Sequence, residues 1–403
     1  MPIQMVDLHR QYLKIKTEID TALINCVEST NYIKGPEVKL FEENLAGYLS
    51  TSHVISCGNG TDALQIAFMA LDLKPGDEVI IPAFTYVATA EAIALLGLIP
   101  VMVDVEQETF NISVKEIENA ITPKTKAIVP VHLYGQSSNM EAIMQLAEKH
   151  GLFVIEDNAQ ALGAETVYSD GTIKKTGTTG HIGCHSFFPT KNLGCFGDGG
   201  ALSTNDPDLA EKCRMISTHG QKRKYYHEVI GCNSRLDTIQ AAILNVKLKY
   251  LDEYIAARQK AAEYYFQNLD NQDWIILPGK VTYAVHSFNQ FTLMVKNGKR
   301  DELQEYLKAN GIPSIIYYPL PLYKQPAFQK FSEPGFTLKN TEQLCNSVLS
   351  IPMHTELTTE IQDYIIKNIR KFHELFTNLT KGYGRYTLQR RKLQNNRGMH
   401  ECP

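Results

Sequence analysis

Short apolar runs alternate with helical patterns along the first part of the chain. Five runs have the length of buried strands, at 53–57 (HVISC), 78–82 (EVIIP), 100–105 (PVMVDV), 126–133 (KAIVPVHL) and 152–157 (LFVIED). Between them apolar residues recur at helical spacing, and helices are expected from Thr61, Thr85, Ser113 and Ser138. This alternation is typical of a mainly parallel sheet covered by helices. It predicts an α/β domain.

A long helical pattern from about Arg235 to Leu269 closes this unit, and a polar cluster at 271–273 follows it. We therefore place a domain boundary there. Residues 1–270 are predicted to form a large domain, with an N-terminal helix, the α/β sheet and the long helix at its end.

A second, smaller unit starts near Trp274. It is predicted from strand patterns at 288–295 and 314–320 and from helix patterns at 300–311 and 358–372. Residues 271–375 are therefore expected to form an α+β domain. Residues 376–403 are basic, polar and poor in apolar periodicity, which predicts a disordered tail.

The charge balance excludes several classes of partner. The 403 residues carry 40 basic and 44 acidic side chains, a formal net charge of −4, so we expect no nucleic-acid or membrane partner. The eight cysteines form no C-x-x-C pair and the first residues form no apolar signal, which predicts reduced thiols and a cytoplasmic location. The apolar stretch 80–103 is interrupted by Pro82, Gly97 and Pro100, so it is not predicted to span a membrane.

The stretch ISCGNGTDALQIAF (55–68) predicts a phosphate site. A strand leads into a glycine turn and then a helix, whose N-terminus attracts anions, and Gly58, Gly60 and Ala63 fit the dinucleotide pattern G-x-G-x-x-A. A dinucleotide site also needs an acidic residue after the second strand, about 20 residues on. Ala83 and its neighbours stand there instead, so an NAD-dependent sugar oxidoreductase is disfavoured.

Asp157 and Lys191 are the residues whose surroundings most suggest chemistry. Asp157 ends a strand predicted to be buried, where a carboxylate needs a cationic partner such as a pyridinium nitrogen; the alternative is a turn cap. Lys191 lies in SFFPTKNLGCFGDGGA, five residues after Ser186. A partly desolvated lysine has a lowered pKa and can form a Schiff base, whereas most lysines are solvated surface charges.

Other candidates carry weaker signals. Phe84 and Tyr86 follow a predicted strand and either stack on a planar cofactor or pack in the core, and Asn233 is expected to cap the long helix. Segment 219–235 mixes basic and aromatic residues, as in a solvated loop or in a loop that covers a neighbouring subunit's site. HIGCH (181–185) matches no zinc spacing, so no metal is expected.

Together, five segments resemble the DegT-like pyridoxal-phosphate (PLP) sugar aminotransferases of the aspartate aminotransferase superfamily. The segments are CGNGTDAL, PAFTYVAT, EDNAQALGAE, SFFPTKNLGCFGDGGA and GCNSRLDTIQAA, in this order, and the resemblance covers about residues 1–375. It implies fold type I, with a mainly parallel seven-stranded sheet and a smaller C-terminal domain.

The resemblance also implies roles for individual residues. Lys191 would carry PLP and move protons, and Asp157 would pair with the pyridinium nitrogen. Gln160 would hydrogen-bond the phenolate oxygen and Tyr86 would stack on the ring. The phosphate would be held by a set of small polar residues, with one of them contributed by the other subunit of a homodimer: Gly60, Thr61, Ser186 and, across the interface, Asn233.

The expected reaction is transamination of a nucleotide-linked ketosugar, with glutamate as amino donor. The best single substrate is a UDP-linked 3-keto-N-acetylglucosaminuronate. This choice rests on three segments that resemble the 3-amino-sugar branch of the family, at 194–201, 219–235 and 315–328. Arg235, Tyr317 and Tyr318 are the candidate substrate contacts. Alternatives are a dTDP-3-keto-6-deoxyhexose, a UDP-4-ketosugar, or a PLP-fold regulatory protein without turnover; retention of Lys191 and Asp157 speaks against the last.

Overall fold

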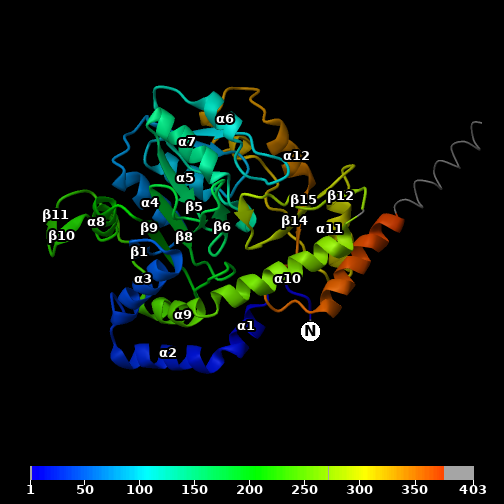
Figure 1. Cartoon of the computed structure of the whole chain (residues 1–403), viewed down its shortest axis with the longest axis horizontal. Coiled ribbons are helices and arrows are strands. Elements are labelled where there is room, and N and C mark those ends of the chain that lie inside the picture. The colour runs from blue at the N-terminus through cyan, green and yellow to red at the C-terminus, as the bar shows by residue number, and fades with distance from the viewer. Residues whose placement is uncertain (1, 271, 376–403) are drawn as a thin grey trace, which may run out of the picture.

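A seven-stranded sheet forms the centre of the large unit in the computed structural model, which describes residues 2–270 and 272–375 (Figure 1). The strands lie in the order β1-β9-β8-β5-β4-β2-β3. Their bounds are β1 (His53–Cys57), β2 (Glu78–Pro82), β3 (Ile99–Val103), β4 (Thr125–Ile128), β5 (Phe153–Asp157), β8 (Ile182–Ser186) and β9 (Gly200–Thr204). Within this sheet β9 runs antiparallel to both neighbours and the other pairs are parallel, which confirms the predicted fold class.

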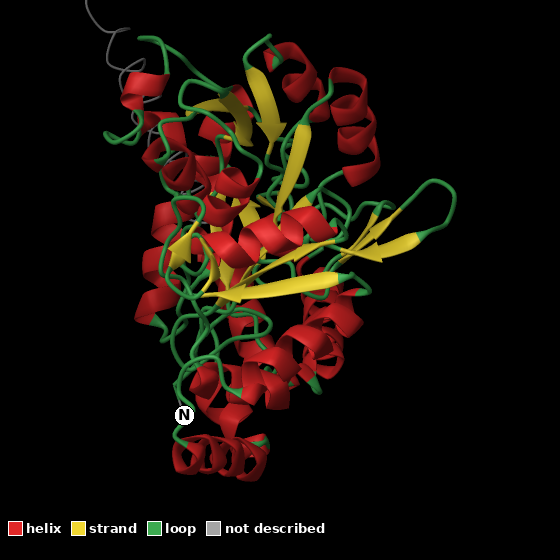
Figure 2. Cartoon of the chain, turned by 90° about the vertical axis from the view of Figure 1, so that its left-hand side faces the viewer, coloured by secondary structure: helices red, strands yellow, loops and turns green. Residues whose placement is uncertain are grey.

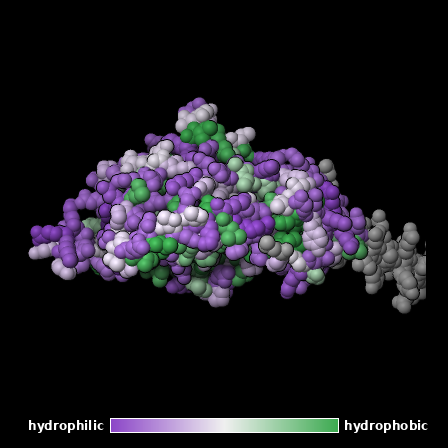
Figure 3. Space-filling model, turned by 90° about the horizontal axis from the view of Figure 1, so that it is seen from below, coloured by the Kyte–Doolittle hydropathy of each residue, from purple (hydrophilic) through white to green (hydrophobic). Residues whose placement is uncertain are grey.

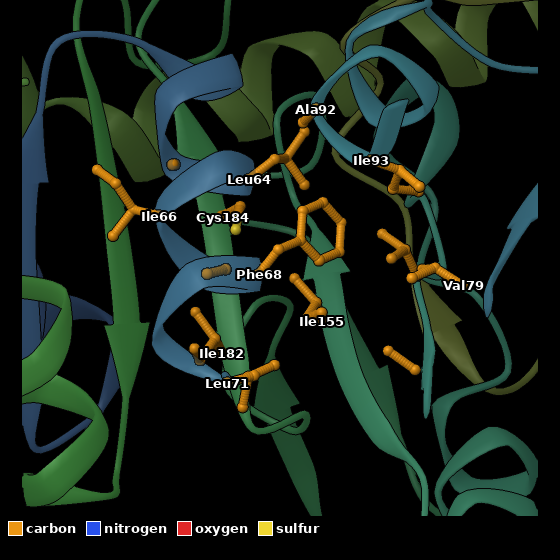
Figure 4. Close-up of a cluster of buried hydrophobic side chains, with 14 of the residues drawn as sticks. Leu64, Ile66, Phe68, Leu71, Val79, Ala92, Ile93, Ile155, Ile182 and Cys184 are labelled. Atoms are coloured by element: carbon orange, nitrogen blue, oxygen red, sulfur yellow. The ribbon is translucent and has the colours of Figure 1, made fainter. Parts of the chain in front are cut away.

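Helices cover both faces of this sheet, because its strands are apolar on both sides. One face packs against α4 (Gly60–Ala70), α5 (Ala88–Leu95) and α8 (Pro207–Ile216). Figure 4 shows Phe68 of α4 among Ile155, Ile182 and Ile93. The other face packs against α6 (Val114–Ala120), α7 (Met140–His150), α3 (Pro36–Leu49) and α9 (Thr238–Leu248).

The helices at the two ends of the large unit differ from the prediction. Three helices precede the sheet instead of one: α1 (Leu8–Lys14), α2 (Lys16–Ser29) and α3. The predicted long helix from Arg235 is two helices, α9 and α10 (Leu251–Leu269), and α9 begins only at Thr238. The break at Lys249 and Tyr250 separates two packing partners, since α9 packs on α2 and α3 whereas the second half of α10 enters the core of the smaller unit.

The smaller unit is built on a three-stranded antiparallel sheet. Its strands, in order, are β12 (Ile275–Ile276), β14 (Phe291–Val295) and β15 (Val348–Ile351), and its helices are α11 (Arg300–Ala309), α12 (Lys339–Ser347) and the helical residues 359–375. The strand predicted at 314–320 is wrong: Ile315 makes one isolated bridge to Ser350, and Pro319 cannot extend a ladder because it lacks an N–H. The division at residue 270 stays a prediction.

Two further pairings lie outside these sheets. The strands β13 (Ala284–Val285), β6 (Glu165–Val167) and β7 (Ile173–Lys175) form a small sheet that joins the two units. A hairpin of β10 (Gln221–Arg223) and β11 (Tyr226–His227) projects from the large unit (Figures 1 and 2). No helix within the described residues has both the length and the apolar character to cross a bilayer. The predicted tail, 376–403, lies outside the described residues.

Candidate active site

The carboxyl ends of the central parallel strands bring the candidate residues together. Asp157 is the last residue of β5, Ser186 is the last residue of β8, and Phe84 and Tyr86 follow β2. In an open parallel sheet this edge is where ligands bind. The separate sequence segments therefore meet at one edge of the sheet.

The Asp157 carboxylate is buried and held in place. Its Oδ2 accepts a hydrogen bond from the Thr89 hydroxyl at 2.7 Å, and its Oδ1 accepts one from the Ala159 N–H at 3.1 Å. Thr89 comes from α5 and was not singled out from the sequence, although it stands in the quoted segment PAFTYVAT. Hydrogen bonds to both of its oxygens therefore fix the orientation of the carboxylate.

Lys191 lies beside this carboxylate at the end of a short turn. Its main-chain N–H donates to the Phe188 carbonyl at 2.9 Å. Burial lowers the pKa of Lys191 to about 8, although the charge of Asp157 acts in the opposite direction. A minor fraction of the amine is thus uncharged at pH 7, far more than for an ordinary lysine, and this fraction can act as a nucleophile.

This lowered pKa predicts a pH-dependent gain in stability when Lys191 is replaced by methionine, measured on cofactor-free protein. The folded-state pKa lies below the unfolded value, so the charged lysine destabilises the fold below pH 8, and this cost disappears as the pH rises toward 10.5. Urea unfolding should show the variant more stable by on the order of 2 kcal/mol at pH 7, with a smaller difference at pH 9.5. A difference that does not change with pH would contradict the lowered pKa.

Gln160 and Tyr318 form a polar contact beside the aromatic residues. The Gln160 Oε1 accepts from the Tyr134 N–H at 2.7 Å, and its Nε2 donates to the Tyr318 hydroxyl at 3.1 Å, which leaves one Nε2 hydrogen for a ligand. The Tyr318 ring lies 6.1 Å from the Phe84 and Tyr86 rings. Tyr86 is 57% exposed, so one face of this aromatic group is open.

Tyr317 packs beside Tyr318 in this group. Its carbonyl accepts a hydrogen bond from the Tyr134 hydroxyl, and it lines a cavity of about 210 Å³ together with Thr190 and residues 4–6. The Tyr317 and Tyr318 rings are in edge contact, 5.8 Å apart, and only the Tyr318 hydroxyl is hydrogen-bonded to Gln160.

The glycine turn forms a cradle at the start of α4. Asn59 caps the helix by accepting from the Asp62 N–H at 2.9 Å, and Gly60 lies so close to Ser186 that a Cβ on it would be 2.7 Å from the Ser186 Cβ. The free N–H groups of the first turn, which include those of Gly60 and Thr61, lie next to the Ser186 side chain. Such an arrangement suits a phosphate.

Ser234 braces this cradle and was also missed in the sequence. Its hydroxyl accepts from the Gly58 N–H at 2.8 Å and donates to the Asp62 carboxylate at 2.5 Å. The only signal for it in the sequence is its place next to Asn233.

Asn233 and Arg235 lie away from Lys191. Asn233 is exposed, pairs with Thr218 through an isolated bridge and does not cap α9, which begins five residues later with Asp237 before it. Arg235 lines a cavity of about 490 Å³ with Lys34 and Arg214. No hydrogen bond or ion pair of the described residues joins either side chain to Asp157 or Lys191.

The HIGCH segment is structural. The His181 Nδ1 accepts from the Val154 N–H at 3.0 Å, and His185 is buried between Asn158 and Ser203. Across residues 2–270 and 272–375, no group of three or more His, Cys, Asp or Glu side chains could hold a metal ion.

Known proteins share this chain's sequence and fold. It is 47% identical over 378 residues to a "Pleiotropic regulatory protein" of Geobacillus stearothermophilus, covering 93% of this chain and 100% of that one. It is 46% identical to the "UDP-2-acetamido-2-deoxy-3-oxo-D-glucuronate aminotransferase" of Pseudomonas aeruginosa, covering 89% and 96%. A solved Bacillus subtilis structure, NtdA with bound cofactor PMP, superposes with a TM-score of 0.82 at 34% identity, covering 89% and 82%.

The residues of this site fit the cofactor of such enzymes. PLP needs an amine of lowered pKa for its aldehyde, a buried carboxylate for its ring nitrogen and N–H donors for its phosphate. Lys191, Asp157 and the Gly60 turn meet these needs. The predicted enzyme class and cofactor are confirmed. Since the family model matches residues 13–370, the chain belongs to the DegT/DnrJ/EryC1/StrS aminotransferase family.

Proposed function

We propose that this enzyme transfers the amino group of glutamate to C3 of a nucleotide-linked 3-ketosugar, with UDP-linked 3-keto-N-acetylglucosaminuronate as the best single substrate. The observation that carries the proposal is the pair formed by Lys191, with its lowered pKa, and Asp157 at the sheet edge. The Pseudomonas aeruginosa relative, 46% identical, supports the substrate by its name.

Each site residue has a role in the proposal. PLP, when bound, supplies an electron sink for the carbon that loses or gains a proton. The Lys191 Nζ takes that proton and returns it, and the Asp157 carboxylate keeps the ring nitrogen protonated. Gln160 and Tyr86 orient the ring. The N–H groups of Gly60 and Thr61 and the Ser186 hydroxyl hold the phosphate.

We propose that the enzyme is a homodimer in which Asn233 completes the partner's site. Asn233 is exposed in the single chain, and no hydrogen bond of the described residues joins its side chain to Lys191. Large apolar side chains are exposed on α1 to α3, in the connection between α2 and α3, and in the segment after β8, as expected for a surface that another subunit covers. They are Leu13, Ile24, Val27, Ile33, Leu40, Phe188 and Phe196. Figure 3, seen from the side of α2, shows apolar groups among polar ones.

Subunit exchange tests this shared site. Lys191→Ala and Asn233→Ala proteins are each expected to be weak or inactive, because each damages both sites of its own homodimer. Each mixed dimer should recover up to about half of the activity of a wild-type dimer, since one of its two sites then keeps both residues. Native mass spectrometry gives the fraction of mixed dimers. Mixed dimers without recovered activity would mean that each chain holds a complete site.

Arg235 supports recognition of an anionic substrate. It makes no ion pair with any described residue, and burial, with repulsion from Arg235 and Arg214, lowers the pKa of Lys34. Arg214 is already paired with Glu42 at 3.0 Å, so Lys34 and Arg235 are the cations of this cavity that are available to attract a diphosphate or carboxylate. Arg235 is proposed to contact the substrate bound in the partner's site. Tyr317 and Tyr318 are proposed to contact the substrate in their own subunit's site.

The reverse reaction tests the proposed function. Purified enzyme would be incubated with 2-oxoglutarate and matched UDP-linked 3-amino and 4-amino sugars, with a dTDP-linked 3-amino sugar as a third arm. The proposal predicts glutamate from the UDP-linked 3-amino sugar at the highest kcat/KM. Glutamate from the 4-amino compound alone would overturn the regiochemistry. No glutamate from any arm would favour a role like that named for the Geobacillus relative, a regulatory protein.

A further inference from the structure

Two buried polar side chains flank Asp157 on the opposite face of the sheet. Successive strand residues point to opposite faces, so Glu156 and Asn158 point away from Thr89 and the site edge. Both are buried, and both bind the connection between β7 and β8, residues 176–180. Neither residue has a role in the amino transfer proposed for this enzyme.

Glu156 accepts four hydrogen bonds. Its Oε2 accepts from the His132 Nε2 at 2.8 Å and the Gly177 N–H at 2.9 Å, and its Oε1 accepts from the N–H groups of Thr179 at 2.7 Å and Gly180 at 2.6 Å. Burial raises the pKa of Glu156, but these hydrogen bonds, led by that from His132, lower it below its ordinary value. The residue is therefore a buried carboxylate with every oxygen engaged.

His132 is held in one tautomer. Its Nδ1 accepts from the Ser138 N–H at 3.0 Å, so the proton lies on Nε2 and is donated to Glu156. The main-chain N–H of His132 donates to the Asp157 carbonyl at 3.1 Å. One residue thus binds the Glu156 side chain and the Asp157 backbone together.

Asn158 closes a second set of bonds to the same connection. Its Nδ2 donates to the Thr176 carbonyl at 3.0 Å and to the His185 Nδ1 at 3.1 Å. The His185 Nε2 donates to the Ser203 hydroxyl at 2.8 Å, and that hydroxyl donates to the Gly177 carbonyl at 2.5 Å. Burial lowers the pKa of His185 to about 4, so its Nδ1 stays free to accept.

Gly177 lets the connection approach these side chains. Its φ is +83°, and a Cβ on it would be 2.6 Å from the His185 ring. The connection therefore packs directly against the back of β5, and it has little room to move.

We propose that the Glu156–His132 pair, with Asn158 and His185 beside it, positions the Asp157 carboxylate for the ring nitrogen of the cofactor. The pair fixes the end of β5 from the face opposite to Thr89, so the direction of the carboxylate is set by the backbone as well as by its own hydrogen bonds. These are positioning residues, since their side chains bind one another and the connection 176–180 and not the groups proposed to hold the cofactor. This inference rests on the proposed role of Asp157.

The test compares Glu156→Gln with Tyr265→Phe. Glutamine keeps one acceptor oxygen, but its NH2 group replaces the other carboxylate oxygen and cannot accept, so two of the four hydrogen bonds to this side chain are lost. Tyr265→Phe removes one buried hydrogen bond, to the Pro352 carbonyl at 3.0 Å, within the core shared by α10 and the smaller unit. It is the control for lost stability alone.

The readouts are the visible circular dichroism of bound PLP, its dissociation constant, and kcat and KM. We expect Glu156→Gln to change the dichroism, weaken PLP binding about tenfold and lower kcat about tenfold to a hundredfold with little change in KM, because misplacement of a catalytic group is costly. Tyr265→Phe should lower the Tm and leave these values unchanged. Ser203→Ala, a milder change, should shift them in the same direction if Glu156→Gln does not fold.

Two results would overturn the inference. Variants that lose stability like Tyr265→Phe and keep the wild-type dichroism would give these residues a purely structural role. An Asp157→Asn protein with unchanged dichroism and kcat would remove the role of Asp157 itself, and with it both the proposed function and this inference.

Discussion

Replacing Lys191 by alanine is expected to lower kcat/KM for amino transfer at least about 1000-fold, because the same amine binds the cofactor and moves the proton. Its lowered pKa and its place beside Asp157 support this double role. The measurement is steady-state turnover of the UDP-linked 3-amino sugar with 2-oxoglutarate. Added ethylamine should restore part of the lost rate, since a free amine can carry the proton.

Lys247→Met is the matched control. The Lys247 amine is also buried, with a pKa lowered by burial to about 8, but it donates to the Gly194 carbonyl at 2.6 Å and does not lie beside Asp157. We expect kcat/KM of this variant to stay within about tenfold of the wild type. Loss of activity in Lys247→Met with activity retained in Lys191→Ala would reverse the assignment.

Asp157→Asn is expected to lower kcat about 100-fold to 1000-fold while the protein still binds PLP. Asparagine fits the same space and keeps an acceptor for Thr89, but it carries no charge to hold the ring nitrogen protonated, so the electron sink is weakened. Thr89→Val, which removes one hydrogen bond to the carboxylate, should cost about tenfold. A kcat for Asp157→Asn within threefold of the wild type would contradict the role of this carboxylate.

The strands of the sheet were predictable because they are buried on both faces. The runs at 53–57 and 78–82 coincide with β1 and β2, since strands that lie between two layers of helices must be apolar on both faces. Lys191, Asp157 and Gln160 could be found because their segments resemble a family, and the structure brings them to one edge. Their chemical roles stay predictions.

The missed features depend on long-range packing. The break between α9 and α10 has no proline or glycine to mark it, because it is set by two different packing partners. Thr89 and Ser234 are ordinary hydroxyl residues in the sequence, and only the fold brings them to Asp157 and Gly58. Glu156 stands next to Asp157, but its four donors come from residues 132 and 177–180.

We propose that Lys191 binds PLP covalently, and one labelling experiment tests this directly. Borohydride reduction of the yellow, cofactor-loaded enzyme fixes the cofactor on the amine that holds it, and peptide mass mapping identifies that residue. We expect the label on Lys191, in the peptide that contains SFFPTKNLG, and none on Lys247. A label on Lys247 or any other lysine, or a protein that carries no reducible cofactor, would contradict it.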